Sequence, residues 1–140
     1  MALLARREHS RHELRRKLLQ AGYEETVVEA ALEELAGEGL QSDRRFAEIF
    51  IHSRVGRGQG PVRILRELSE HGVDASLAGE LMEALEVDWS VLAEEVRRRR
   101  FGAELPTEWK ERARQARFLE YRGFRHHHFA ALLDNGAWHP

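Results

Sequence analysis

The sequence contains no cysteine, which excludes disulfides, thiolate nucleophiles and cysteine-based zinc sites. It has only three prolines, and no Asn-Gly or Asp-Gly pair separates alternating apolar runs, so β-hairpins are poorly supported. No run approaches the roughly 18 consecutive apolar residues of a membrane-spanning helix. The short apolar segment after Met1 runs straight into charged residues and does not read as a secretory signal. We therefore expect a cytoplasmic protein.

Motifs for nucleotide or metal chemistry are missing as well. The segment Gly56-Arg-Gly-Gln-Gly60 is followed by Pro61 and lacks the Gly-Lys-Ser/Thr of a P-loop, so we interpret it as a flexible linker that frees Arg57. The side chains of His126-His127-His128 would point about 100° apart on a helix and cannot converge on one ion, so we interpret them as a solvated first turn. We predict no active site, no cofactor and no metal, and therefore not an enzyme.

Signals for helices are abundant. Ser10-x-x-Glu13 and Thr26-x-x-Glu29 are predicted capping boxes, each followed by an apolar stripe at helical spacing. The aromatic residues at positions 46, 50, 89, 109 and 118 fall mostly on core positions by the same spacing. Further helix starts are predicted at Ser42 or Asp43, at Pro61 and at Asp88.

A glycine recurs at near-constant spacing with the same neighbours. Gly22, Gly72 and Gly123 are each preceded by a leucine four residues earlier and followed directly by an apolar or aromatic residue. This pattern is typical of a Schellman cap, in which glycine ends a helix in the left-handed conformation. Because the spacings are 50 and 51 residues, the chain contains an internal repeat.

These repeats predict an all-α fold: a tandem array of three three-helix repeats that forms an elongated, curved body. We place the repeats at residues 1–41, 42–87 and 88–140. The helix before Ser10 has room for only about two turns, so the first copy is expected to begin mid-helix.

Charge alternates along the chain despite the net charge of −2. Residues 21–43 and 67–96 contain no lysine or arginine, whereas residues 1–20, 44–66 and 97–125 are basic. Arg16, Arg66 and Arg117 each lie six residues before a repeat glycine, about 160° around the helix from the leucine of the core stripe. We therefore expect them to face solvent and to form part of a basic face that binds an anionic partner. The predicted face consists of Arg16, Arg54, Arg57, Arg63, Arg66, Arg97, Arg98, Arg99, Arg100, Arg114 and Arg117.

Four segments spread over nearly the whole chain carry a family resemblance: Arg7-Glu-His-Ser-Arg-His-Glu-Leu-Arg-Arg-Lys-Leu18, Asp43-Arg-Arg-Phe46 with Ser53-Arg54, Gly60-Pro-Val-Arg-Ile-Leu-Arg-Glu-Leu68 and Arg117-Phe-Leu-Glu-Tyr-Arg-Gly-Phe124. In this order they resemble the RecX family. The resemblance implies tandem three-helix units and a bacterial regulator that binds RecA and RecA–single-stranded DNA filaments. It also implies that recombinase, ATPase and coprotease activities in DNA repair and the SOS response are modulated, usually by inhibition.

Two other functions fit the same residues. A helix-turn-helix-like module could bind nucleic acid directly through its basic helices, and a helical adaptor could serve another protein. Because the net charge is nearly neutral, we expect at most weak direct binding of DNA. We also expect a monomer that does not associate with membranes.

Overall fold

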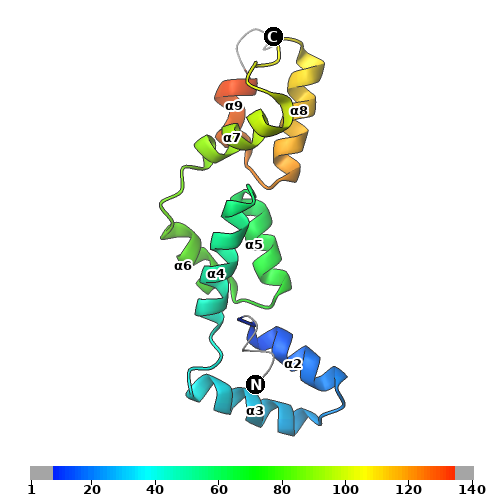
Figure 1. Ribbon diagram of the computed structural model, residues 1–140, viewed down its shortest axis with the longest axis vertical. Coiled ribbons are helices and arrows are strands. Elements are labelled where there is room, and N and C mark those ends of the chain that lie inside the picture. Colours follow the sequence, from blue (N-terminus) through cyan, green and yellow to red (C-terminus); the bar gives the residue numbers. More distant parts are fainter. Residues whose placement is uncertain (1–7, 135–140) are drawn as a thin grey trace. The chain divides into compact units, whose positions relative to one another are not determined.

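The computed structural model describes residues 8–134. This part of the chain forms eight α-helices and no strand (Figure 1), which confirms the all-α prediction. The helices are α2 (Arg11–Gln20), α3 (Glu25–Gly37), α4 (Asp43–Gly56), α5 (Pro61–Glu70), α6 (Ala75–Glu83), α7 (Trp89–Phe101), α8 (Trp109–Tyr121) and α9 (His126–Leu133). Among these helices, none is both long and apolar enough to cross a bilayer. Most of the short helix predicted before Ser10 lies outside the described residues.

The helix starts follow the predicted caps with one exception. Ser10 accepts from the backbone N–H of Glu13, and the Glu13 carboxylate accepts from the Ser10 N–H, so the first capping box is confirmed. The second is wrong, because α3 begins one residue before Thr26 and its N-cap residue, Glu24, makes no side-chain cap. Pro61 begins α5 and Asp88 caps α7 as predicted, and the Ser42 hydroxyl accepts from the Arg45 N–H at the start of α4.

Ser10→Ala tests the confirmed capping box at the start of α2. We expect the free energy of unfolding to fall by about 2–3 kcal/mol, because the variant loses the cap and the 2.7 Å bond that the Ser10 hydroxyl donates to the His71 carbonyl. Thr26→Ala is the matched control and should change stability by less than about 0.5 kcal/mol. Urea denaturation followed by circular dichroism measures both values, and equal losses would contradict the assignment of the caps.

All three repeat glycines end their helices in the left-handed conformation, with φ values of 98°, 78° and 102° for Gly22, Gly72 and Gly123. In each case the next residue donates its N–H to the carbonyl of the leucine four residues before the glycine, which completes the Schellman motif. The predicted apolar contact partners are buried in the second and third motifs: Leu68, Val73, Leu119 and Phe124. In the first motif Tyr23 is 56% exposed.

The helices are divided between two compact units. Unit 1 consists of Met1–Ser53 and Arg66–Ala84, and unit 2 of Arg54–Leu65 and Leu85–Pro140, so the division passes through α4 and α5. In unit 1, Leu14 packs with Val28, Leu32 and Leu35 of α3. In unit 2, α7, α8 and α9 share a core of Ala93, Val96, Leu119, Phe124, Phe129 and Leu133. The limits of the repeats and the elongated, curved body stay predictions.

Each unit contains a contact of the same kind between consecutive repeats. In unit 1, which holds the first joint, the start of α2 meets the end of α5 where Ser10 bonds to the His71 carbonyl. In unit 2, which holds the second joint, the N–H groups of Gly60 and Val62 donate to the carbonyls of Arg122 and Gly123 at 2.8 and 2.9 Å. Ser10 and Gly60 each lie twelve residues before their own repeat glycine. In both joints, backbone carbonyls at a helix C-terminus therefore meet donors at a helix N-terminus.

Candidate functional site

The arginine that recurs six residues before each glycine is exposed in all three repeats. Arg16 lies on α2, Arg66 on α5 and Arg117 on α8, and each side chain faces solvent. The leucines two residues further on, Leu68 and Leu119, are fully buried in the second and third repeats. The prediction that these arginines face away from the core is confirmed, because the helix rotates the two positions to opposite sides.

The arginines three residues earlier are engaged by neighbouring side chains. Arg63 is half-buried and its guanidinium lies 5.4 Å from the centre of the Tyr121 ring. Arg114 is exposed, pairs with Glu111 at 2.7 Å and lies 5.1 Å from the centre of the Phe101 ring. Such exposed ion pairs contribute at most about 1 kcal/mol, so Arg114 can exchange this partner for another anion.

Arg97 is the clearest correction to the predicted basic face. Its side chain is 0% exposed, whereas Arg98, Arg99 and Arg100 are exposed. The guanidinium pairs with Glu94 at 2.7 Å and also donates to Gln115 and to the carbonyls of Ala103 and Glu104. Arg97 therefore ties the end of α7 to the following loop and to α8, and its assignment to the exposed face is wrong. The carboxylate of Glu94 one turn earlier was the signal for this role.

The glycine-rich segment after α4 is a packed turn and not the flexible linker that we predicted. Gly58 and Gly60 are buried, and a Cβ atom on Gly60 would lie 2.4 Å from the carbonyl carbon of Gly123. Arg122 holds the turn by donating from Nη2 to the carbonyls of Arg57 and Gly58 at 2.6 and 3.4 Å. The turn fixes the backbone of Arg57, whose side chain is exposed.

This turn forms one wall of a cavity of about 290 Å³ in unit 2, here named the arginine pocket. Phe118 also lines the cavity, and the centre of its ring lies 5.4 Å from the Arg100 guanidinium and 5.8 Å from that of Arg122. Burial lowers the pKa of Arg122, and the nearby charge of Arg63 lowers it further. The pocket is lined by Arg57, Gly58, Val96, Arg99, Arg100, Phe118 and Arg122.

Sequence reasoning placed three of these arginines, Arg57, Arg99 and Arg100, on the basic face but missed Arg122. The equivalent residue of the second repeat, one before the glycine, is His71. Arginine therefore does not recur at this position in the repeats, and no spacing pattern in the sequence indicated Arg122.

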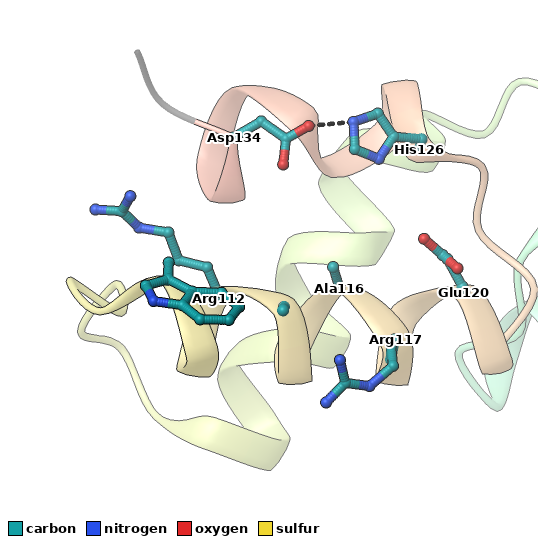
Figure 2. Close-up of a pocket in the computed structure, with 8 residues that line it drawn as sticks. Arg112, Ala116, Arg117, Glu120, His126 and Asp134 are labelled. Atoms are coloured by element: carbon teal, nitrogen blue, oxygen red, sulfur yellow. Dashed lines mark ion pairs between the residues drawn. The ribbon is translucent and has the colours of Figure 1, made fainter. Parts of the chain in front are cut away.

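A second pocket lies between α8 and α9 (Figure 2). His126 pairs there with Asp134, and Glu120 and Arg117 of α8 line the same space. Both acidic and basic groups line it, so it offers no field of one sign to a charged ligand. The lining residues are Trp109, Arg112, Ala113, Ala116, Arg117, Glu120, His126 and Asp134.

The three consecutive histidines have different surroundings. His126 and His127 are exposed, but His128 is buried, so the prediction of a solvated turn is wrong for His128. The Nδ1 atom of His128 accepts from the Arg125 N–H at 2.9 Å. Burial lowers the pKa of His128, and the neighbouring charges of His127 and Arg125 act in the same direction. Across residues 8–134, no three potential ligand side chains are grouped to hold a metal ion.

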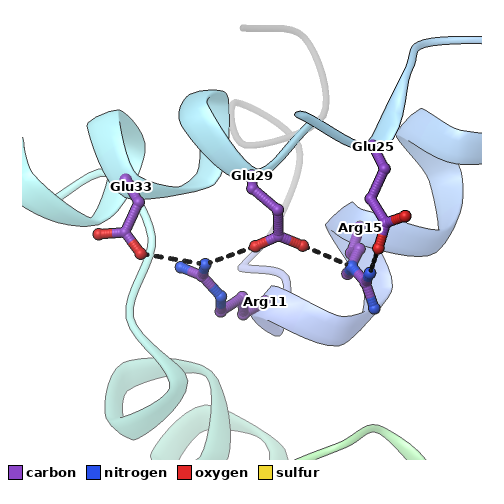
Figure 3. A network of polar contacts seen from close by, with 5 residues as sticks. All are labelled: Arg11, Arg15, Glu25, Glu29 and Glu33. Carbon is purple, nitrogen blue, oxygen red and sulfur yellow. Dashed lines mark hydrogen bonds and ion pairs between the residues drawn. The ribbon is translucent and has the colours of Figure 1, made fainter. Parts of the chain in front are cut away.

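The acidic helix α3 neutralises part of the basic helix α2 (Figure 3). Arg15 pairs with Glu25 and Glu29 at 2.7 Å each, and Arg11 bridges Glu29 and Glu33. Part of the alternating charge along the sequence therefore serves to form ion pairs between adjacent helices.

Two other predicted positions differ from expectation in exposure. Trp109 is 62% exposed, so its assignment to the core is wrong, whereas Phe46 and Phe50 are buried as predicted. Arg54 lies half-buried at the end of α4, so it is less available than the exposed arginines of the predicted face.

Family models of RecX match three successive parts of the chain. The first three-helix domain matches residues 1–35, the second residues 42–82 and the third residues 88–131. The chain belongs to the RecX family.

Curated RecX relatives extend over most of this chain. "Regulatory protein RecX" of Halorhodospira halophila is 52% identical over 124 residues, which cover 89% of this chain and 77% of that protein. "Regulatory protein RecX" of Pseudomonas entomophila is 46% identical over 134 residues, covering 96% and 86%. These names support a regulatory role.

Solved RecX structures share the fold at low sequence identity. The crystal structure of RecX from Lactobacillus salivarius has a TM-score of 0.80 at 18% identity and covers 95% of this chain and 88% of that one. Another crystal structure of regulatory protein RecX has a TM-score of 0.82 at 19% identity, covering 96% and 69%.

Proposed function

We propose that this RecX-family chain binds RecA and RecA–single-stranded DNA filaments and inhibits recombinase, ATPase and coprotease activity in DNA repair and the SOS response. It acts by binding and not by catalysis. The observation that carries the proposal is the exposure of Arg16, Arg66 and Arg117 at one position of each repeat. A long anionic protein–DNA partner offers the same type of contact many times, so a repeated cation suits it.

A titration tests the function itself. RecA ATPase activity on single-stranded DNA is measured as the chain is added, and we expect the rate to fall to a saturating minimum. A rate that does not respond at saturating concentration would exclude the proposed function. If the chain instead binds bare DNA tightly, with a steep dependence on salt, and leaves the ATPase unchanged, a direct nucleic-acid-binding module is the better description.

Charge reversal tests the repeated arginines. We expect Arg66→Glu combined with Arg117→Glu to weaken filament binding roughly 100-fold, about tenfold for each reversed contact. The control is Arg44→Glu with Lys110→Glu, which reverses one exposed cation in each unit away from the repeated positions and, within residues 8–134, breaks only the exposed pair of Arg44 with Glu80. Fluorescence anisotropy of labelled filaments gives the affinities, and circular dichroism checks that the variants stay helical. Equal losses in both double variants would remove Arg66 and Arg117 from the interface.

A further inference from the structure

The two joints carry opposite chemistry at equivalent positions. Nine residues before the glycine, the first repeat has Glu13 and the second has Arg63; one residue before the next glycine lie His71 and Arg122. In the first joint the Glu13 carboxylate lies 3.4 Å from Nδ1 of His71, so an acid faces a base. In the second joint both residues are arginines, and burial together with the positive charge of Arg63 lowers the pKa of Arg122.

Arg122 cannot swing away from this repulsion. Its Nη2 is held by the carbonyls of Arg57 and Gly58, and its Nε is buried without a hydrogen-bond partner. The side chain as a whole is half-buried, and a buried N–H donor without a partner is costly unless an acceptor approaches it. The turn after α4 and the end of α8 thus hold a cation in place before any ligand arrives.

Three further arginines surround this fixed cation. Arg57 comes from the turn, and Arg99 and Arg100 come from the last turn of α7. No carboxylate is among the described residues that line the pocket, in contrast to the acidic pairs that engage Arg11, Arg15 and Arg114. Four guanidiniums around one cavity provide planar donors from several directions, which suits the oxygens of a phosphate group.

We propose that the arginine pocket binds a phosphodiester group of a DNA strand. The guanidiniums of Arg100 and Arg122 already lie over the Phe118 ring, so a DNA base cannot stack on it. The contact is therefore to the DNA backbone and does not depend on the base sequence. The proposal rests on the function proposed above, because it takes the strand in the filament as the source of the phosphate.

The test measures binding of a labelled dT20 strand to the full chain by fluorescence anisotropy at several salt concentrations. Arg57→Glu with Arg99→Glu should weaken binding roughly 100-fold and reduce the magnitude of the salt slope by about 0.7, the value for one lost phosphate contact on a single strand. These two side chains are exposed and appear in no contact that supports the fold. Lys110→Glu, an exposed cation of α8 outside the pocket, is the control and should change affinity less than about threefold.

Competition identifies the source of the anion. A dT20 strand should displace the label far better than inorganic phosphate or dTTP, because neighbouring phosphates add contacts outside the pocket. Displacement by polyglutamate as efficient as by dT20 would identify an acidic protein segment as the ligand and overturn the proposal. So would a double variant that binds dT20 as well as Lys110→Glu does. The RecA ATPase titration with the unmodified chain is independent, so a failure of the proposed function is distinguished from a failure of the pocket.

Discussion

Arg97→Ala is expected to lower the free energy of unfolding of unit 2 by about 3–5 kcal/mol, the cost of removing one partner from a buried ion pair. Glu94 would lose the buried guanidinium 2.7 Å away, and Gln115 and two backbone carbonyls would lose their donor. Truncation would also leave a cavity beside the core of α7 and α8. Urea denaturation followed by circular dichroism measures the loss.

Arg98→Ala is the matched control, because Arg98 is the next residue on the same helix and is exposed. It should change stability by less than about 0.5 kcal/mol. Arg97→Met combined with Glu94→Leu removes both charges and should recover part of the loss, since no carboxylate is then left without its partner. If Arg97→Ala is as stable as Arg98→Ala, the buried network does not support unit 2.

Gly123→Ala is expected to destabilise unit 2 by about 2–5 kcal/mol. A left-handed residue with a Cβ atom costs about 1–2 kcal/mol, and overpacking adds about 1–3 kcal/mol. The overpacking arises because the new methyl group would lie 2.4 Å from the Cβ atom of Arg63 and 2.7 Å from its backbone nitrogen. Thermal and urea unfolding measure the change.

Gly22→Ala separates the two costs. Gly22 has nearly the same φ, 98° against 102°, but nothing lies within 4 Å of the added methyl group. The free energy of unfolding of this variant should therefore fall only by the conformational cost of about 1–2 kcal/mol. A second pair avoids positive φ altogether: Gly60→Ala is blocked by the Gly123 backbone, whereas Gly56→Ala meets open space. Equal losses within both pairs would contradict the close packing of the second joint.

These two expected results bear on the proposed ligand site. Arg97 secures the end of α7, on which Arg99 and Arg100 lie, and the contact between Gly60 and Gly123 secures the turn that carries Arg57. The arginine pocket therefore depends on the close backbone contact between Gly60 and Gly123, which leaves no room for a side chain at either position. Substitutions that loosen the joint should weaken DNA binding together with stability, whereas Arg57→Glu with Arg99→Glu should affect binding alone.

Local chemistry along the chain was enough to predict the helices, the glycine caps and the repeat. A Schellman glycine or an N-cap serine acts through its own backbone and its nearest neighbours, so Gly22, Gly72, Gly123 and Ser10 could be recognised from spacing. The exposure of Arg16, Arg66 and Arg117 followed for the same reason, because helical rotation places them opposite a buried leucine. The false capping box at Thr26 shows the limit, since a shift of two residues, from an N-cap at Thr26 to one at Glu24, removes the bond.

Only the tertiary structure decided which arginines are exposed and which are held by ion pairs and hydrogen bonds within the fold. Arg97 and Arg98 are consecutive arginines that each follow a glutamate by three residues, but within residues 8–134 only Arg97 has partners, Gln115 and Glu104, in other segments. The turn at residues 56–60 reads as a linker until Gly123 packs against it, and Arg122 stands out only because Arg63 and the carbonyls of that turn surround it. Burial and long-range pairing depend on where distant segments meet, and no local spacing in the chain encodes that meeting.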